Sequence, residues 1–294
     1  MQVPVHEFAS FLDRTPDQIA KGPIAIILIE DDTAVPETIT HHIGCGFRHV
    51  LALSDRPLDL PDGMAGDMAA RVTNLICETR RPDAHVGVVN RIIAAVPPAT
   101  WLYYCFNAEF LFYPFCETRS VGEMLAFHTE ERRDAMLSYV VDLYAADLSL
   151  HPNAVDLDRP LFDRTGYYAL GRKGPDGHTL DRQLDFHGGL RWRYEELLPP
   201  DRTRIDRIAL FRTQPDLKVL ADHRFNVAEY NTYSCGWHHN LTASIASFRV
   251  AKALATNPGS RDLVRDMTWR NSHPFRWDSQ QLMNKGLMEP GQWF

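Results

Sequence analysis

The segment from Cys105 to Leu111 carries an amide and a carboxylate at a spacing suited to metal binding. Asn107 and Glu109 stand two residues apart, directly after an aromatic run that favours a strand. Alternate residues of an extended chain point to the same side, so both side chains can offer oxygen to a divalent cation such as Mn²⁺ or Mg²⁺. Such a cation would stabilise charge on a departing diphosphate. In the alternative interpretation, Glu109 caps a helix or pairs with an arginine.

A second group, residues 187–196, places two glycines ahead of two arginines. A Gly-Gly turn lets backbone amides approach an anion closely. On a strand, Arg191 and Arg193 would share one face, where both could hold a phosphate bidentately. These residues therefore suggest a diphosphate clamp.

Carboxylates beside this group could supply a catalytic base. Transfer of a group to a hydroxyl requires a base that takes the hydroxyl proton. Glu195 or Glu196 could act in this way, and Asp185 is a rival. In the alternative interpretation, each of these acids pairs with an arginine at the surface.

Tandem histidines form a third candidate site. His238 and His239 lie within residues 235–240, and imidazole is an acceptable ligand for manganese-like ions. Tandem histidines are also commonly structural, with one ring buried and the other exposed. We expect a structural role for the other pair, His41 and His42, because it lies in the middle of a predicted helix.

The elements that must position these residues alternate between strands and helices in the first half of the chain. We predict strands at residues 24–29, 50–53, 72–77 and 101–106, with helices at 36–44 and 85–95. This alternation predicts a doubly wound sheet, whose ligands lie beyond the carboxyl ends of the strands. Asp31 and Asp55 follow two of those ends and could bind the ribose and base of a nucleotide. Helix capping and loop stabilisation are the alternatives for both.

The second half has a different pattern. Residues 130–146 show apolar side chains at helical spacing, which predicts an amphipathic helix. Short strands are expected at 167–170, 190–193 and 208–211, and a further helix begins at Asn240 or Thr242 and ends at 257–259. Residues 269–294 show little periodicity, and we expect them to wrap the surface.

In the order of its predicted strands, helices and acidic motifs, the chain resembles the GT-A-type glycosyltransferases, specifically the family 2-like group. Members of this group carry an Asp-x-Asp-Glu-Phe-Leu element after the corresponding strand. The resemblance runs from Pro23 to Leu111. It includes the acidic stretch at 30–32, the helix, turn and second strand at 38–55, and the motif strand at 101–111. The resemblance implies an α/β fold of the Rossmann-like GT-A type, with a mostly parallel central sheet and an elaborated C-terminal half.

The resemblance also implies roles for individual residues. It places Asn107, Glu109 and His238 around the cation and the diphosphate between Arg191 and Arg193. The nucleotide would lie against the residues Glu30, Asp31, Asp55 and Asn90. The family's aspartates are absent: Asn107 and Glu109 take the best-matching positions, or one acid is missing if Glu109-Phe110 aligns with the family's Glu-Phe. An amide is a poor ligand for a hard cation, so metal binding should be weak or absent.

Composition excludes several other classes. The net charge of −7 and the pI of about 6.0 exclude the strongly basic face that nucleic-acid binding needs. Five scattered cysteines predict a reducing compartment. The acidic N-terminus does not fit a signal peptide, and prolines and polar residues interrupt the apolar stretch at 92–116. We therefore expect a cytoplasmic protein without a transmembrane segment, with peripheral contact at the inner face of the membrane left open.

These observations predict a glycosyltransferase that moves a sugar from a nucleotide-sugar donor to a glycan or lipid-linked acceptor, with Glu195 or Asp185 as the base. We expect a leader (1–22), a nucleotide-sugar-binding half (23–116), an acceptor-side half (117–268) and a tail (269–294). The first alternative is a catalytically inert relative that binds a nucleotide sugar or glycan. The second is a metal-dependent phosphohydrolase that uses His187, His238 and His239.

Overall fold

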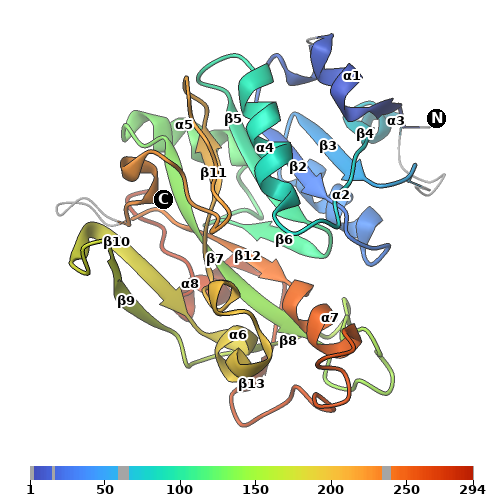
Figure 1. Ribbon diagram of the computed structural model, residues 1–294, viewed down its shortest axis with the longest axis vertical. Coiled ribbons are helices and arrows are strands. Elements are labelled where there is room, and N and C mark those ends of the chain that lie inside the picture. Colours follow the sequence, from blue (N-terminus) through green and yellow to red (C-terminus); the bar gives the residue numbers. More distant parts are fainter. Residues whose placement is uncertain (1–2, 15–16, 59–65, 234–239, 294) are drawn as a thin grey trace. The chain divides into compact units, whose positions relative to one another are not determined.

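Figure 1 shows the computed structural model, which describes residues 3–14, 17–58, 66–233 and 240–293. The chain divides into two compact units whose segments interleave in sequence. Unit 1 consists of Met1–Phe110, Arg119–Met136 and Ile208–Asn231, and unit 2 consists of Leu111–Thr118, Leu137–Arg207 and Thr232–Phe294. Two segments beyond residue 116 thus belong to unit 1, whereas the sequence suggested successive halves.

Unit 1 is built on a mostly parallel sheet. Its parallel strands lie in the order β1 (Val5–Glu7), β4 (Val72–Ile76), β3 (His49–Ser54), β2 (Ile24–Leu28) and β5 (Trp101–Phe106), and β11 (Asp206–Arg212) pairs antiparallel with β5. Every residue of β2 is buried, as expected for an Ile-rich strand covered on both faces. The sheet is compatible with a Rossmann-like fold.

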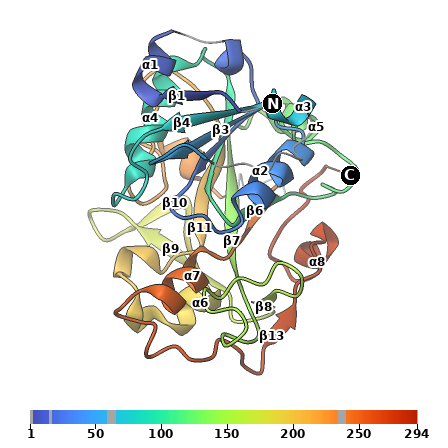
Figure 2. The same cartoon turned by 90° about the vertical axis from the view of Figure 1, so that its right-hand side faces the viewer.

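Helices cover both faces of this sheet. In Figure 2, α1 (Phe8–Asp13) and α4 (Ala84–Ala95) lie on one side of the strands, with α2 (Val35–Gly44) and α5 (Val121–Glu130) on the other. The short α3 (Gly66–Ala69) precedes β4. A capping box starts α5, because the side chain of Ser120 accepts from the backbone of Glu123 and the Glu123 carboxylate accepts from the backbone of Ser120.

The strand order creates a switch point between β2 and β5. From β2 the chain adds β3 and then β4 on one side, and it returns to place β5 on the other side of β2. In open α/β sheets, ligands bind beyond the carboxyl ends of the two strands at such a point. Residues 29–34 and 107–108 follow those two strand ends.

Unit 2 contains a group of parallel and antiparallel strands and a hairpin. Most of β7 (Ala135–Tyr144) lies here, and it pairs parallel with β12 (Ala243–Ser247) and antiparallel with β8 (Leu161–Asp163), which in turn pairs with β13 (Ser272–Pro274). The hairpin joins β9 (Tyr168–Lys173) and β10 (Thr179–His187). The remaining elements are α6 (Gly189–Arg193), α7 (Arg249–Thr256) and α8 (Ser279–Asn284), and β6 (Glu109–Phe112) continues along the chain from unit 1 into unit 2.

The structure confirms the predicted strands and helices of residues 24–106 to within a few residues. The helix predicted at 130–146 is wrong, because residues 135–144 form β7, whose nearly continuous burial suits the β-branched pair Val140 and Val141. The strand predicted at 190–193 is also wrong, since these residues belong to α6. The predicted helix after Asn240 proves to be a strand, β12, followed by α7.

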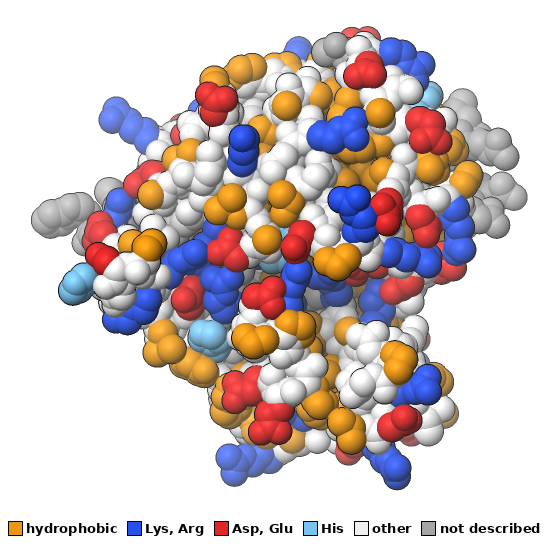
Figure 3. Space-filling view, in the orientation of Figure 1, with side chains coloured by type: hydrophobic (Ala, Val, Ile, Leu, Met, Phe, Trp, Pro, Cys, Tyr) orange, Lys and Arg blue, Asp and Glu red, His pale blue; other side chains and the backbone are white. Residues whose placement is uncertain are grey.

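Three observations concern the cysteines, the absence of membrane-spanning helices among the described residues, and the surface charge. Cys45, Cys77, Cys105 and Cys116 are free thiols. Within the described residues, no helix combines the length and the apolarity that a membrane crossing needs. Acidic and basic side chains interleave on the face drawn in Figure 3, in keeping with a net charge of −7.

Candidate functional site

Asn107, predicted as a metal ligand, ties together the two strand ends at the switch point. Its side-chain oxygen accepts from the backbone N–H of Glu30 at 2.9 Å, and its Nδ2 donates to Asp31 Oδ1 at 2.8 Å and to the carbonyl of Thr33 at 3.0 Å. The side chain is fully buried. Asp31 Oδ1 also accepts from the backbone of Thr33 at 2.8 Å. The amide of Asn107 therefore holds the loop after β2 in place.

Glu109, the second predicted ligand, points into the protein. It is fully buried, and its Oε2 accepts from the backbone N–H of Phe106 at 2.9 Å. Its charge also acts on the buried His42, whose pKa burial lowers to about 3. Glu109 therefore does not present its carboxylate to solvent as a ligand site requires, because the tight turn at Ala108, with φ of +59°, folds it back onto the preceding strand, β5.

The described residues do not fit a cation at this place. The oxygen of Asn107 is already bonded, Glu109 is enclosed, and His238 lies outside the described residues. No group of three or more His, Cys, Asp or Glu side chains suited to a metal ion occurs in the described parts of the chain.

The other residues predicted to bind the nucleotide are spread over unit 1. Asp55, after β3, is exposed and pairs with Arg80 at 3.2 Å. Asn90 has a structural role, because its amide exchanges two hydrogen bonds with the backbone of Val219, at 2.8 and 3.0 Å. Glu30 and Asp31 are half-buried at the end of β2. None of the four is fully buried, and Asp55 is the most exposed.

Arg191 lies in unit 2 and binds a buried carboxylate of the protein itself. Its backbone N–H donates to Asp142 Oδ2 at 3.2 Å and its Nε donates to Asp142 Oδ1 at 3.3 Å. A Cβ on Gly189, which has φ of +63°, would lie 3.0 Å from Asp142 Oδ2. The Gly-Gly turn thus approaches an anion, as the sequence suggested, and that anion is Asp142.

Arg193 also binds groups of the protein itself. It donates to Asp163 Oδ1 at 3.2 Å and to the carbonyl of Met267 at 2.7 Å, and its guanidinium lies 4.9 Å from the ring centre of Trp269. Asp163 also accepts from the hydroxyl of Tyr144 at 2.5 Å and from Trp269 Nε1 at 2.7 Å. The prediction of a diphosphate clamp on one strand face is wrong, since both arginines lie on a helix and each holds a different internal carboxylate.

The two predicted bases lie near the same histidine of unit 2. Asp185 is half-buried and accepts from Arg204 at 3.1 Å, and Glu195 is exposed. Burial, the largest cause, lowers the pKa of His187 below its ordinary value, and the charge of Arg204 acts in the same direction. The charges of Asp185 and Glu195 oppose this effect. The imidazole is therefore mostly uncharged at neutral pH.

His187 also lines an aromatic pocket that the sequence analysis missed. The cavity measures about 180 Å³ and lies wholly within unit 2. Its aromatic walls are Tyr139, Tyr167, Tyr168, Phe186 and Tyr233, and Glu289 supplies a carboxylate. Phe186 meets Tyr139 and Tyr233 edge to face, with ring centres 4.9 and 5.5 Å apart, and Tyr168 stacks on His187 at 5.1 Å. The adjacent residues Tyr167 and Tyr168 are the one feature of the local sequence that indicates an aromatic pocket.

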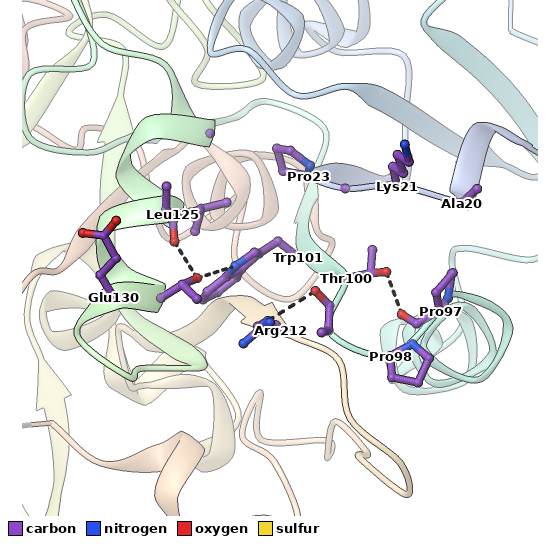
Figure 4. Close-up of a pocket in the computed structure, with 15 residues that line it drawn as sticks. Ala20, Lys21, Pro23, Pro97, Pro98, Thr100, Trp101, Leu125, Glu130 and Arg212 are labelled. Carbon is purple, nitrogen blue, oxygen red and sulfur yellow. Dashed lines mark hydrogen bonds between the residues drawn. The ribbon is translucent and has the colours of Figure 1, made fainter.

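A second hollow, in unit 1, lies at the amino ends of β2 and β5 (Figure 4). It measures about 690 Å³. Trp101 lies across it and donates from Nε1 to Thr129 Oγ1 at 3.1 Å, and Arg212 donates to the carbonyl of Ala99 at 3.3 Å. This edge of the sheet is opposite to the one where nucleotides bind in such folds. We therefore take the aromatic pocket as the candidate site.

No protein-family model matches the sequence, and no curated protein matches it.

Proposed function

We propose that this chain is a glycosyltransferase-like protein that binds a sugar ligand, and that it does so without a cation held by Asn107 and Glu109. The observation that carries the proposal is the pocket of unit 2, in which five aromatic rings and one carboxylate surround about 180 Å³. The apolar faces of sugar rings stack on aromatic side chains, while polar groups at the edge set orientation. The volume suits a single sugar ring better than a whole nucleotide sugar.

The sheet of unit 1 supports the glycosyltransferase-like part of the proposal. Its switch point between β2 and β5 is the place where open α/β sheets bind nucleotides. Asp31 and Asp55 stand at that edge, and carboxylates suit the paired hydroxyls of a ribose.

The buried Glu109 favours one alignment of the metal motif over the other. A carboxylate that bonds the backbone of the preceding strand has the character of a structural residue, which matches Glu109-Phe110-Leu111 with the family's Glu-Phe-Leu. In this alignment Phe106 and Ala108 stand at the two aspartate positions, so both acids are missing rather than one, and neither side chain can bind a cation. This alignment supports the inert, sugar-binding alternative over metal-assisted transfer.

Transfer without a metal is the second candidate. It is favoured by Asp185 and Glu195, whose charges act on His187 at the wall of the pocket. In that case one of the two carboxylates would take the acceptor proton.

Calorimetry with a panel of monosaccharides and nucleotide sugars, with EDTA and with Mn²⁺, tests the proposal. We expect binding that EDTA does not change and that Tyr168→Ala weakens about tenfold. Leu170→Ala is the matched control, because Leu170 is exposed on the same strand and does not line the pocket. Binding that needs Mn²⁺, or no binding by any sugar, would contradict the proposal. Release of sugar from a nucleotide sugar, lost in Glu195→Gln or Asp185→Asn, would establish the second candidate.

A further inference from the structure

The aromatic pocket of unit 2 has a distinctive charge balance. Glu289 is the one acidic side chain among its described lining residues, and no lysine or arginine is among them. His187 adds little positive charge, because burial lowers its pKa. The described lining is therefore negative at neutral pH.

The carboxylate of Glu289 is held in a fixed position. Its Oε1 accepts from the hydroxyl of Tyr233 at 2.6 Å. Its backbone N–H donates to Thr242 Oγ1 at 2.9 Å, and its carbonyl accepts from the backbone of Thr242 at 3.0 Å. Among the described residues, no lysine or arginine forms an ion pair with it. A carboxylate fixed in this way can pair with a cation that enters the pocket.

The tyrosine hydroxyls beside Glu289 already have partners. The hydroxyl of Tyr139 bonds that of Tyr233, which also accepts from Asn240 and donates to Glu289. Burial, the largest cause, raises the pKa of both tyrosines, so they stay neutral. These hydroxyls have little hydrogen-bonding capacity left for a neutral sugar, whereas the electron-rich ring faces attract a cation.

From this charge balance we infer that the pocket selects a ligand with a positively charged amine, and that the sugar it binds is an amino sugar with a free ammonium group. The inference rests on the proposed sugar-binding function and specifies the class of sugar. The ammonium group lies against the rings and pairs with Glu289, and the ring of the sugar stacks on the remaining aromatic wall.

The test compares three sugars of the same size class by calorimetry at neutral pH. Glucosamine carries the positive charge, whereas glucose and N-acetylglucosamine do not. We expect glucosamine to bind at least tenfold more tightly than either neutral sugar, and added NaCl to weaken it. Tetramethylammonium, a cation without a sugar, serves as the fourth probe.

Two variants test whether Glu289 causes the preference for glucosamine. Glu289→Gln keeps the shape and the bond from Tyr233 but removes the charge, so it should reduce glucosamine affinity about tenfold and leave N-acetylglucosamine unchanged. Asp262→Asn is the matched control, because Asp262 is an exposed acid of unit 2 outside the pocket. A loss of glucosamine binding in Asp262→Asn equal to that in Glu289→Gln would overturn the assignment.

Failure of this inference and failure of the proposed function give different results. If the three sugars bind equally, the inference is overturned and the proposed function stands. If tetramethylammonium binds in a Glu289-dependent manner and no sugar binds, the cation site is supported and the proposed function fails. If nothing binds, both are overturned.

Discussion

The side-chain amide of Asn107 donates to the carboxylate of Asp31 at 2.8 Å and so joins the ends of β5 and β2. Each atom of this amide that can form a hydrogen bond is in use, because the oxygen accepts from Glu30 and the nitrogen also donates to Thr33. An asparagine meets this requirement and an aspartate does not, since an aspartate at this position has no N–H to donate. The asparagine at this position thus has a structural explanation.

The first prediction concerns this amide. Asn107→Asp would remove both donated hydrogen bonds and place a buried carboxylate beside the half-buried Asp31. We expect the free energy of unfolding in urea to fall by about 2–4 kcal/mol. Asn257→Asp, an exposed change, should have little effect. If Asn107→Asp keeps full stability and gains Mn²⁺ affinity by calorimetry, the structural role of Asn107 is wrong.

The second prediction concerns pH. Burial lowers the pKa of His42 from 6.5 to about 3, so between these values the unfolded chain binds a proton that the folded chain excludes. Stability should therefore be full above pH 6.5 and fall as the pH falls toward 3, by up to about 1.4 kcal/mol per pH unit from this group. Urea unfolding at several pH values should give a shallower slope for His42→Leu. His178→Gln, an exposed control, should leave the slope unchanged.

The third prediction separates structural support from phosphate binding. Arg191→Met would leave the buried Asp142 without its guanidinium partner, so we expect a loss of about 3–5 kcal/mol of unfolding free energy. Arg261→Met removes an exposed pair and should change stability by less than about 0.5 kcal/mol. Unchanged stability in Arg191→Met together with lost nucleotide binding would restore the clamp hypothesis.

The fourth prediction concerns a wall of the aromatic pocket. A Cβ on Gly188 would lie 2.2 Å from Cδ1 of Tyr167, so Gly188→Ala must displace that ring or the turn. We expect a loss of about 1–3 kcal/mol in stability and a weaker sugar complex. Gly177→Ala, at a position with open space around it but also with positive φ, is a control for backbone strain alone. Equal effects of the two changes would show that the ring contact is unimportant.

The parallel strands of unit 1 were predictable because burial on both faces leaves a local mark. The Ile-rich residues of β2 and the aromatic residues of β5 are apolar without interruption, and turn residues bound them. β7 was not predictable in the same way, since Met136, Val140 and Leu143 also fit a helix. Only its long-range pairing with β12 and β8 decides the matter.

The candidate site was harder to predict for a related reason. The sequence identified polar residues suited to ligands, yet Asn107, Arg191 and Arg193 satisfy other groups of the protein. Type and spacing cannot distinguish a partner within the protein from one outside it. The rings of the aromatic pocket come from separate segments, and only the fold brings Tyr139 and Tyr233 together with Glu289.

The interleaving of the two units limits how the protein can be dissected. The chain passes from one unit to the other after residues 110, 118, 136, 207 and 231. No single truncation point yields either unit whole, and a fragment ending at residue 116 would lack α5 and β11. Fragments that aim to isolate the aromatic pocket would have to rejoin three stretches of polypeptide with new linkers, so functional work is better done by point substitution in the intact chain.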